Sequence, residues 1–317
     1  ASDVYKRQVT APDFGTIGIG DTDEFSDAYF FTFQNFLTPT SLYAADARIN
    51  SVKTVKSLPS YFDSSKYKVE QFKATSKDGE KIPYFVISAK DITLNGNNPT
   101  LLSAYGGFEV SRQPVYSGVI GQAWLEKGGV FVLANIRGGG EFGPKWHQAG
   151  LKEKRQNIYN DFHAVAEDLI AKRITSSKHL GIQGGSNGGL LMGVAFTQRP
   201  DLYNAVVCQV PLLDMQRYNK LLAGASWMGE YGNPDIPAEW EYIKKYSPYQ
   251  NLFNMKHALS DQYETWQRVL MGAGWTPYSV GIETEKKKKK SKKIKPLKQK
   301  FLKCLLEELM YCFVIKL

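Results

Sequence analysis

From about residue 68 onward, apolar residues fall into short runs that alternate with longer amphipathic segments. Residues 100–105 and 130–136 are compact apolar runs of strand length, which predicts buried strands. Residues 157–172 instead place apolar side chains at intervals of three and four, which predicts one face of a helix. Strands that alternate with helices predict an α/β fold with a doubly wound, mostly parallel sheet. Further strands are expected at residues 69–75, 81–88, 179–183 and 205–210, and a further helix near residues 119–127.

The N-terminal part of the chain has a different pattern. Residues 28–33 and 41–46 are two short β-like runs joined by a turn at Pro39, which predicts a pair of strands. Because two strands do not form a stable domain alone, we expect them to be the end of a larger all-β unit. Residues 1–8 match no pattern.

Beyond about residue 252 the alternation of strands and helices is lost. Residues 286–300 contain ten lysines and no acidic residue, which is typical of a solvated segment. The net charge of +9 rests on this segment, so the basic balance does not predict a nucleic-acid-binding protein. No apolar run reaches the roughly 20 residues that span a bilayer. Residues 301–315 are apolar and follow the lysines, which leaves contact with a membrane surface open.

Residues 184–188 read Gly184-Gly185-Ser186-Asn187-Gly188 and stand between a predicted strand and an apolar helix. This is the G-x-S-x-G pattern of the nucleophile elbow in α/β-hydrolases, where a sharp turn exposes a reactive serine. Glycines two residues before and two after the serine let the backbone turn tightly. The sequence therefore predicts that Ser186 is a nucleophile.

The partners of such a serine are harder to find. In this fold the order along the chain is Ser, then Asp or Glu, then His, and only His257 follows Ser186. His257 precedes Asp261, so the order is wrong and we do not expect it to be the base. His163 is expected on the solvent side of its helix, and His147 is expected to pack or to form hydrogen bonds near the site. The sheet is accordingly expected to lack its final strands and to expose an apolar edge.

Several further motifs follow the predicted strands in a fixed order. They are Tyr105-Gly106-Gly107-Phe108, the stretch from Asn135 to Gly143 with its triple glycine, Trp227, Glu230-Tyr231-Gly232-Asn233-Pro234 and Tyr246-Ser247-Pro248. With the elbow, they make residues 25–252 resemble the prolyl oligopeptidase family of serine peptidases. The resemblance covers the last part of that family's β-propeller and about the first two thirds of its α/β-hydrolase domain.

The resemblance implies roles for individual residues of the reaction. Ser186 would form the acyl-enzyme, which requires a base to take its proton. The backbone N–H of Asn187 and the hydroxyl of Tyr105 would stabilise the oxyanion of the tetrahedral intermediate. The family's triad Asp and His have no counterpart after Leu252, so the chain is expected to be catalytically incomplete.

The resemblance also implies a pocket for the proline ring of a substrate. Trp227 corresponds to the indole that stacks on this ring, and Phe108, Tyr231 and Leu212 correspond to other walls. Leu212 replaces a smaller branched residue of the family pattern.

Two alternatives remain open. The stretch from Glu230 to Pro234 also resembles oligopeptidase B, although Trp227 and the Ser186-Asn187 pair favour the proline-cleaving branch. A catalytically inactive α/β-hydrolase fold used for interaction is the second alternative. Arg137 and Glu141 flank the triple glycine, and we expect them to be structural and to pair across that loop.

The sequence thus predicts an unmatched N-terminus with the end of a β-propeller over residues 1–67, an incomplete hydrolase domain over residues 68–252 and an unmatched lysine-rich tail over residues 253–317. The two unmatched ends are expected to reflect translation outside the true reading frame. Short proline-containing peptides are the expected partners, with no cofactor, metal, nucleic acid or membrane. The three cysteines predict no disulfide framework, and Cys208 is expected to be a core thiol. A cytoplasmic monomer is expected, with a periplasmic location as the alternative.

Overall fold

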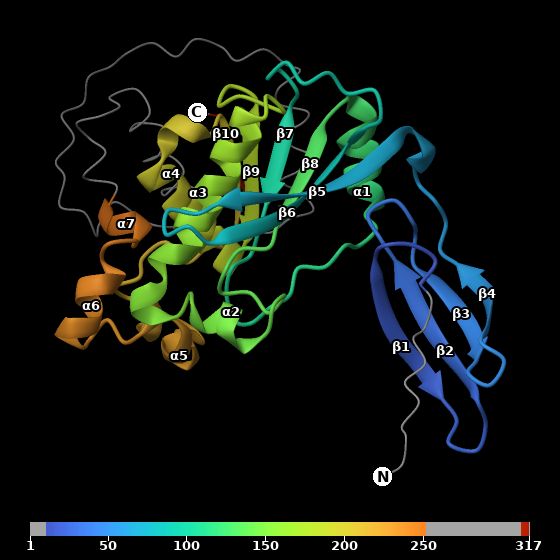
Figure 1. Ribbon diagram of the computed structural model, residues 1–317. Helices are drawn as coiled ribbons and strands as arrows, with labels where there is room; N and C mark the ends of the chain where they lie inside the picture. The colour runs from blue at the N-terminus through green and yellow to red at the C-terminus, as the bar shows by residue number, and fades with distance from the viewer. Residues whose placement is uncertain (1–10, 252–311, 317) are drawn as a thin grey trace.

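The computed structural model describes residues 11–251 and the backbone of residues 312–316. Expectations for residues 1–10, 252–311 and 317, including those for His257 and Asp261, lie outside the described residues. Two sheets make up the described part, and Figure 1 shows the smaller one standing to one side of the larger one.

The smaller sheet is antiparallel and has the order β1-β2-β3-β4. Its strands are Thr16–Thr22, Ala28–Gln34, Ser41–Asp46 and Ser51–Ser57. The pattern predicted β2 and β3, and both are confirmed. It missed β1 and β4, in which most side chains are exposed and only two residues of each strand are apolar.

The core of this sheet is small, and it consists of Phe31, Phe33 and Ala45 with a few half-buried neighbours. Such a core buries little apolar area for four strands. Two hydrogen bonds tie the sheet to the rest of the chain: the Thr16 hydroxyl donates to the carbonyl of Pro114 at 2.7 Å, and the amide of Tyr116 donates to Gln34 Oε1 at 3.3 Å.

The larger sheet has the order β11-β10-β9-β7-β8-β6-β5. Its four central strands, β10, β9, β7 and β8, are parallel to one another. The flanking strands β5, β6 and β11 join antiparallel. The bounds are Tyr67–Thr75 for β5, Lys81–Ala89 for β6, Thr100–Ser103 for β7, Val130–Ala134 for β8, Leu180–Gly185 for β9, Ala205–Gln209 for β10 and Cys312–Lys316 for β11.

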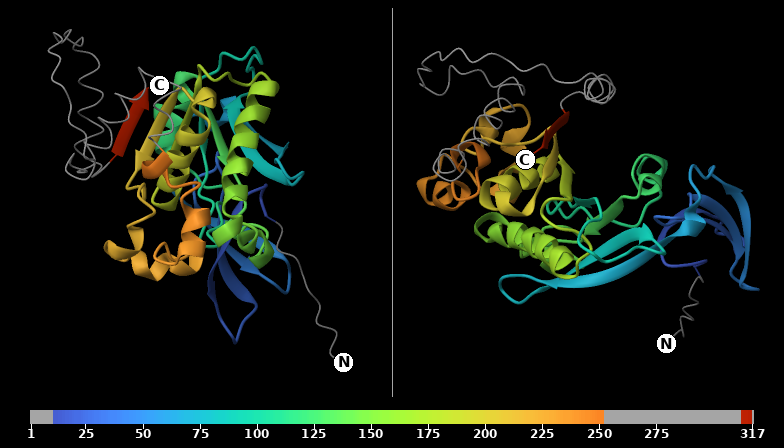
Figure 2. Two further views of the ribbon diagram at one scale, coloured as in Figure 1. Left: turned by 90° about the vertical axis from the view of Figure 1, so that its left-hand side faces the viewer. Right: turned by 90° about the horizontal axis from the view of Figure 1, so that it is seen from above.

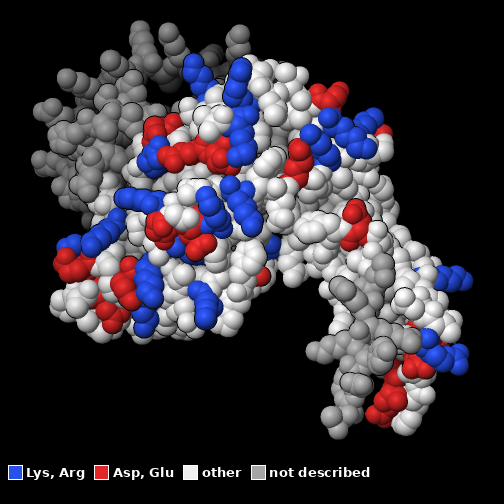
Figure 3. All heavy atoms as spheres, in the orientation of Figure 1, with Lys and Arg blue, Asp and Glu red and all other residues white. Residues whose placement is uncertain are grey.

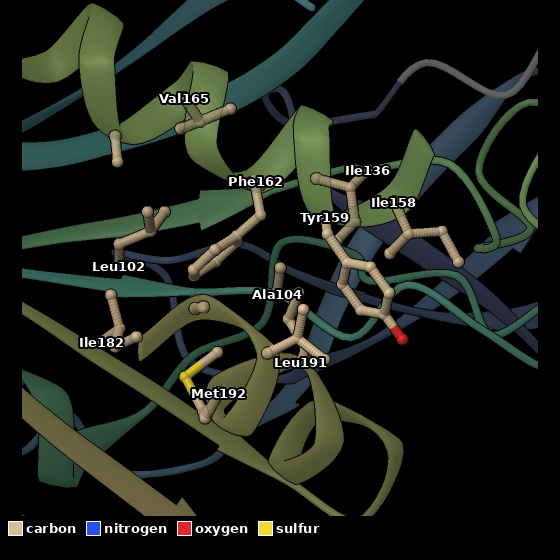
Figure 4. Packing of buried hydrophobic residues seen from close by; sticks show 14 of the residues in the cluster. Leu102, Ala104, Ile136, Ile158, Tyr159, Phe162, Val165, Ile182, Leu191 and Met192 are labelled. Carbon is tan, nitrogen blue, oxygen red and sulfur yellow. The ribbon is translucent and has the colours of Figure 1, made fainter. Parts of the chain in front are cut away.

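Helices cover both faces of the larger sheet, as the alternation predicted. Strand β6 shows the two faces, because Tyr84 and Val86 belong to one buried cluster and Phe85 and Ile87 to another. The first cluster lies under α3 (Gln156–Ala171) and α4 (Asn187–Gln198), whose apolar side chains meet the strands in Figure 4. The second lies under α1 (Gly118–Ala123) and the short 3-10 turn Leu125–Lys127.

The remaining helices are short. They are α2 (Pro144–Gln148), α5 (Met228–Tyr231), α6 (Pro237–Ile243) and α7 (Pro248–Asn251), the last of which packs against α4. Figures 1 and 2 show α2, α5 and α6 grouped at one end of the larger sheet. In open α/β sheets, sites form at the carboxyl ends of the strands.

Two expectations about the sheet and its helices are wrong. The sheet was expected to expose an apolar edge, but the edge of β10 is covered, because β11 pairs with it antiparallel from Ala205 to Gln209. The side chain of His163 is 7% exposed rather than on the solvent side of α3. The turn Pro200–Leu202 contacts α3 and is followed by Tyr203, whose hydroxyl lies 2.8 Å from His163 Nδ1. A second side of the helix is therefore buried.

The charge of the described residues is mixed rather than basic. In Figure 3, lysine and arginine side chains are interspersed with aspartate and glutamate over the face in view. Within the described residues, no helix is both long and apolar enough to cross a membrane.

Candidate active site

Ser186 lies between the end of β9 and the start of α4, as the elbow motif predicted. Its backbone has φ 58° and ψ −118°, a conformation that side chains with a Cβ rarely adopt. The amide of Ser186 donates to the carbonyl of Gln209 on β10 at 3.0 Å, which fixes the turn to the neighbouring strand. Ser186 is exposed, so the strained turn presents the hydroxyl at the surface.

The glycines of the elbow are required by close packing. A Cβ at Gly184 would lie 2.4 Å from the carbonyl oxygen of Gly188, so the strand and the helix approach each other without side chains between them. A Cβ at Gly188 would lie 3.1 Å from the carbonyl oxygen of Ala104, and a Cβ at the following Gly189 would lie 2.7 Å from the carbonyl oxygen of Gln209. The Gly-x-Ser-x-Gly spacing is thus explained by sterics at this turn.

Asn187 begins α4, and it is 2% exposed, with both its amide nitrogen and its amide oxygen hydrogen-bonded. Its Nδ2 donates to the carbonyl of Tyr105 at 2.6 Å. Its Oδ1 accepts from the hydroxyl of Tyr231 at 2.9 Å and from Nη2 of Arg155. Asn187 therefore joins the elbow to the segment after β7 and to helix α5.

Tyr105 follows β7, and its side chain is half-buried. Its ring lies beside the first turn of α4, since a Cβ at Gly188 would be 3.6 Å from Tyr105 Cδ2. The structure thus brings Tyr105 and Asn187 together at the elbow. Their convergence on one oxyanion position stays a prediction.

The four residues expected around a proline ring all belong to, or pack against, the hydrophobic cluster under α3 and α4. Phe108 has φ 56°, and its ring packs edge-on against Tyr231 with 5.6 Å between the ring centroids. Tyr231 is fully buried, and Phe108, Leu212 and Trp227 are half-buried against the same cluster. Trp227 ends the 3-10 turn Gly224–Trp227 directly before α5. A shared pocket beside Ser186 stays a prediction.

Sequence reasoning missed a buried ion pair at this place. Arg155, at the start of α3, is 1% exposed, and Glu230 on α5 is 6% exposed. Nη1 of Arg155 donates to Glu230 Oε1 at 3.0 Å, and the amide of Phe108 donates to the same oxygen at 3.0 Å. Glu230 belongs to the Glu230–Pro234 motif, which could have indicated that it lies at the site, whereas no sequence motif contains Arg155.

His147 on α2 completes this group. Its Nε2 lies 2.8 Å from Glu230 Oε2, and Glu109 Oε2 lies 3.9 Å from its Nδ1. The expectation that His147 forms a hydrogen bond is confirmed, and its partner Glu230 is in turn bonded to Arg155. Among residues 11–251, no histidine ring forms a hydrogen bond with the Ser186 hydroxyl, since His147 contacts carboxylates and His163 contacts Tyr203.

Burial shapes the protonation of these groups. Burial alone would lower the pKa of the Arg155 guanidinium, but Tyr159, Tyr231 and the Glu230 carboxylate raise this pKa above its ordinary value. Burial also raises the pKa of the Tyr231 hydroxyl. Arg155 is therefore charged and Tyr231 neutral near neutral pH, so both can donate to Asn187.

The expected pairing of Arg137 with Glu141 is wrong. Arg137 instead donates to Asp161 and to Asp78, with Nη–O distances of 2.6 and 2.5 Å. Glu141 Oε1 accepts from the amide of Arg112 at 2.8 Å. Asp161 lies on α3 and Asp78 in the β5–β6 hairpin turn, so Arg137 ties these elements together and has a structural role.

The thiol of Cys208 is buried in β10 and donates to the carbonyl of Gly189 at 3.4 Å, as a core thiol. Within residues 11–251, no group of three or more His, Cys, Asp or Glu side chains is arranged to hold a metal ion.

Comparisons with known proteins agree with this geometry. An uncharacterized peptidase, y4nA, of Sinorhizobium fredii (strain NBRC 101917 / NGR234) is 56% identical over 245 residues, which are 77% of this chain and 34% of the relative. The prolyl endopeptidase of Elizabethkingia miricola is 39% identical over 247 residues, or 78% of this chain and 35% of the relative. A solved post-proline cleaving enzyme from Rickettsia typhi has a TM-score of 0.70 at 50% identity, and the match covers 75% of this chain and 34% of that chain.

The chain spans about a third of the length of these relatives. Residues 117–271 match the sequence model of the prolyl oligopeptidase family, which extends past the expected domain end at residue 252. The boundaries after residues 67 and 252 stay predictions. Through its α/β-hydrolase domain, the chain belongs to the prolyl oligopeptidase family of peptidases.

Proposed function

We propose that Ser186 is the nucleophile of a serine peptidase that cleaves short peptides after proline. The observation that carries this proposal is the elbow itself: Ser186 is exposed on a left-handed turn, and Asn187 beside it is hydrogen-bonded to both Tyr105 and Tyr231. One residue thus links the serine to the expected oxyanion donor and to the expected proline pocket.

In the proposed reaction, the Ser186 oxygen attacks the carbonyl carbon of the residue before the scissile bond. The carbonyl oxygen becomes an oxyanion, which the Asn187 N–H and the Tyr105 hydroxyl stabilise by hydrogen bonds. Removing one such donor costs about 2.7–4 kcal/mol of transition-state stabilisation. The C–N bond then breaks, the amine leaves with a proton, and water hydrolyses the acyl-enzyme.

The specificity for proline rests on aromatic surfaces. A rigid five-membered ring stacks on a flat indole without loss of rotamer freedom, and Trp227 would supply that surface. Phe108 and Tyr231 already meet edge to face and would form a second wall. The names of the Elizabethkingia and Rickettsia relatives support cleavage after proline.

The complete reaction also needs a base, and we propose that this 317-residue chain has none. Among residues 11–251 the rings of His147 and His163 are bound elsewhere and His179 precedes the serine in the chain, and the sequence beyond offers only His257 in the wrong order. Such a serine keeps the stabilisation of the oxyanion and of binding, which is worth about 10³–10⁴-fold over water. A reactive phosphorus electrophile is therefore expected to label Ser186 slowly, whereas the cleavage of an amide is expected to be too slow to measure.

The test is labelling with a fluorophosphonate that carries a prolyl residue, with an alanyl fluorophosphonate as the comparison. We expect the prolyl probe to modify Ser186, as located by mass spectrometry, and to react faster than the alanyl probe. The Ser186→Ala chain is the control and should not be labelled. Equal labelling of that variant, or no labelling at position 186 in the parent chain, would overturn the proposed nucleophile.

A further inference from the structure

We propose that Arg155 is a positioning residue that, together with Glu230, holds the oxyanion side and the proline side of the site in one fixed relation. This inference rests on the proposed function, because it assigns Arg155 to the reaction at Ser186. Neither residue contacts the serine hydroxyl; each acts through a neighbour that belongs to the site.

Arg155 reaches both sides with one guanidinium. Nη2 donates to Oδ1 of Asn187, whose backbone N–H is the expected oxyanion donor. Nη1 donates to Glu230 Oε1 at 3.0 Å. The carbon Cζ lies 4.3 Å from the centre of the Tyr231 ring, so the plane of the guanidinium also packs against an expected wall of the pocket.

Glu230 continues the connection to the second wall. Its Oε1 accepts from the Phe108 amide at 3.0 Å, in addition to the bond from Arg155. Phe108 has φ 56°, a left-handed conformation that a residue with a Cβ keeps only when its surroundings hold it there. His147, at 2.8 Å, occupies Glu230 Oε2. The carboxylate thus holds the backbone of Phe108 in place.

The chemistry of this connection requires arginine. A guanidinium donates in two directions in one plane, whereas the ammonium of lysine is a compact point charge. A lysine at position 155 would keep the charge that Glu230 needs but would not reach both Glu230 and Asn187. Asn187 and Phe108 would then move independently by fractions of an ångström.

The chain offers a matched control for this substitution. Arg137 is 5% exposed and also donates to two carboxylates, the buried one of Asp161 and the exposed one of Asp78, but it connects these rather than site residues. R155K and R137K therefore make the same chemical change in two comparable buried ion pairs. Their urea unfolding midpoints show whether the loss of stability is similar.

The first measurement is the rate of labelling of Ser186 by the prolyl and alanyl probes in the 317-residue chain. For R155K we expect the prolyl rate to fall about 10- to 100-fold, since a misplacement of about 1 Å can cost about 100-fold and a smaller one costs less, and the prolyl preference over alanyl to be lost. For R137K we expect both rates to stay within about twofold and the preference to be kept. If R137K loses the preference as R155K does, Arg155 is merely structural and the proposal fails.

The second measurement does not depend on the chemistry of Ser186. Hydrogen exchange at the Phe108 amide should become about fivefold faster in R155K, because its hydrogen bond to Glu230 is weakened, and should not change in R137K. Unchanged exchange in R155K overturns the proposal whatever the probes show. If the parent chain is not labelled at all, the proposed function fails, and the exchange result alone decides whether Arg155 holds Phe108.

A second variant covers the case in which R155K does not fold. Glu230→Gln keeps the shape of the side chain and an oxygen for the Phe108 amide, but it removes the counter-charge of Arg155. The same loss of prolyl preference is expected, to a smaller extent. Full retention of the preference in folded E230Q would contradict the proposal.

Discussion

Gly184 at the end of β9 and Gly188 in the first turn of α4 are in direct backbone contact, so that a Cβ on Gly184 would lie 2.4 Å from the Gly188 carbonyl oxygen. This contact sets the angle between strand and helix and thereby the left-handed conformation of Ser186. A side chain at position 184 must push the helix away from the strand.

Gly184→Ala is therefore expected to destabilise the protein by about 1–3 kcal/mol, as overpacking does, and to abolish labelling of Ser186. Gly181→Ala on the same strand is the control, because a Cβ there would lie 3.7 Å from its nearest neighbours. Urea unfolding and probe labelling of the two variants test this. Labelling of G184A at the parent rate would show that the contact does not define the elbow.

The elements could be predicted where burial produced a periodic pattern. Strand β8, whose residues are all buried or half-buried, and helix α3, most of whose residues are, were found, whereas β4, with every residue exposed, was not. The elbow was found because its glycines are a steric requirement that is local in sequence. Arg155 was missed because its partners, Asn187 and Glu230, are distant in sequence, and only the tertiary structure joins them.

Errors of the sequence analysis have the same origin. The side chain of His163 was assigned to solvent because its own helix leaves that face polar, but the Pro200–Leu202 turn and Tyr203 cover it. Arg137 was paired with its neighbour Glu141, whereas the fold brings Asp161 and Asp78 to it. In each case a contact distant in sequence replaced the local one.

The burial of His163 predicts a pH dependence of stability. Burial lowers the pKa of His163 to about 4 from an ordinary value of 6.5. Between these two pH values the unfolded chain binds a proton at His163 that the folded chain does not bind. The free energy of unfolding is therefore highest, as far as His163 is concerned, above pH 6.5, and it falls as the pH is lowered toward 4. The slope is about 1.4 kcal/mol per pH unit.

Urea unfolding at pH 7 and pH 5 measures this effect. In His163→Gln, unfolding should take up about one proton fewer between these two pH values. The substitution also removes the contact of the imidazole with Tyr203. His179→Gln is the control, because His179 is exposed, and it should leave the slope unchanged. An unchanged slope in H163Q would show that another group is responsible.

Trp227 is expected to determine the preference for proline. Trp227→Ala should lower the prolyl-over-alanyl labelling ratio about tenfold, because it removes an apolar surface that only the proline ring covers. Trp240→Ala is a suitable control, since Trp240 is half-buried against the same cluster on α6. An equal loss with both probes, or the same change in both variants, would argue against stacking on Trp227.

The last prediction concerns turnover. Members of a catalytic triad act as a unit, so the absence of the base costs about as much as the absence of the nucleophile. The 317-residue chain should therefore not hydrolyse a glycyl-prolyl chromogenic substrate at a measurable rate, although its elbow is formed and Asn187 is hydrogen-bonded to the Tyr105 carbonyl. Hydrolysis of this substrate by the purified chain, compared with its Ser186→Ala variant, is the measurement. Turnover that disappears in S186A would mean that a base is present after all. Because His147 is held by Glu230 and His163 by Tyr203, His257 would then be the first residue to replace.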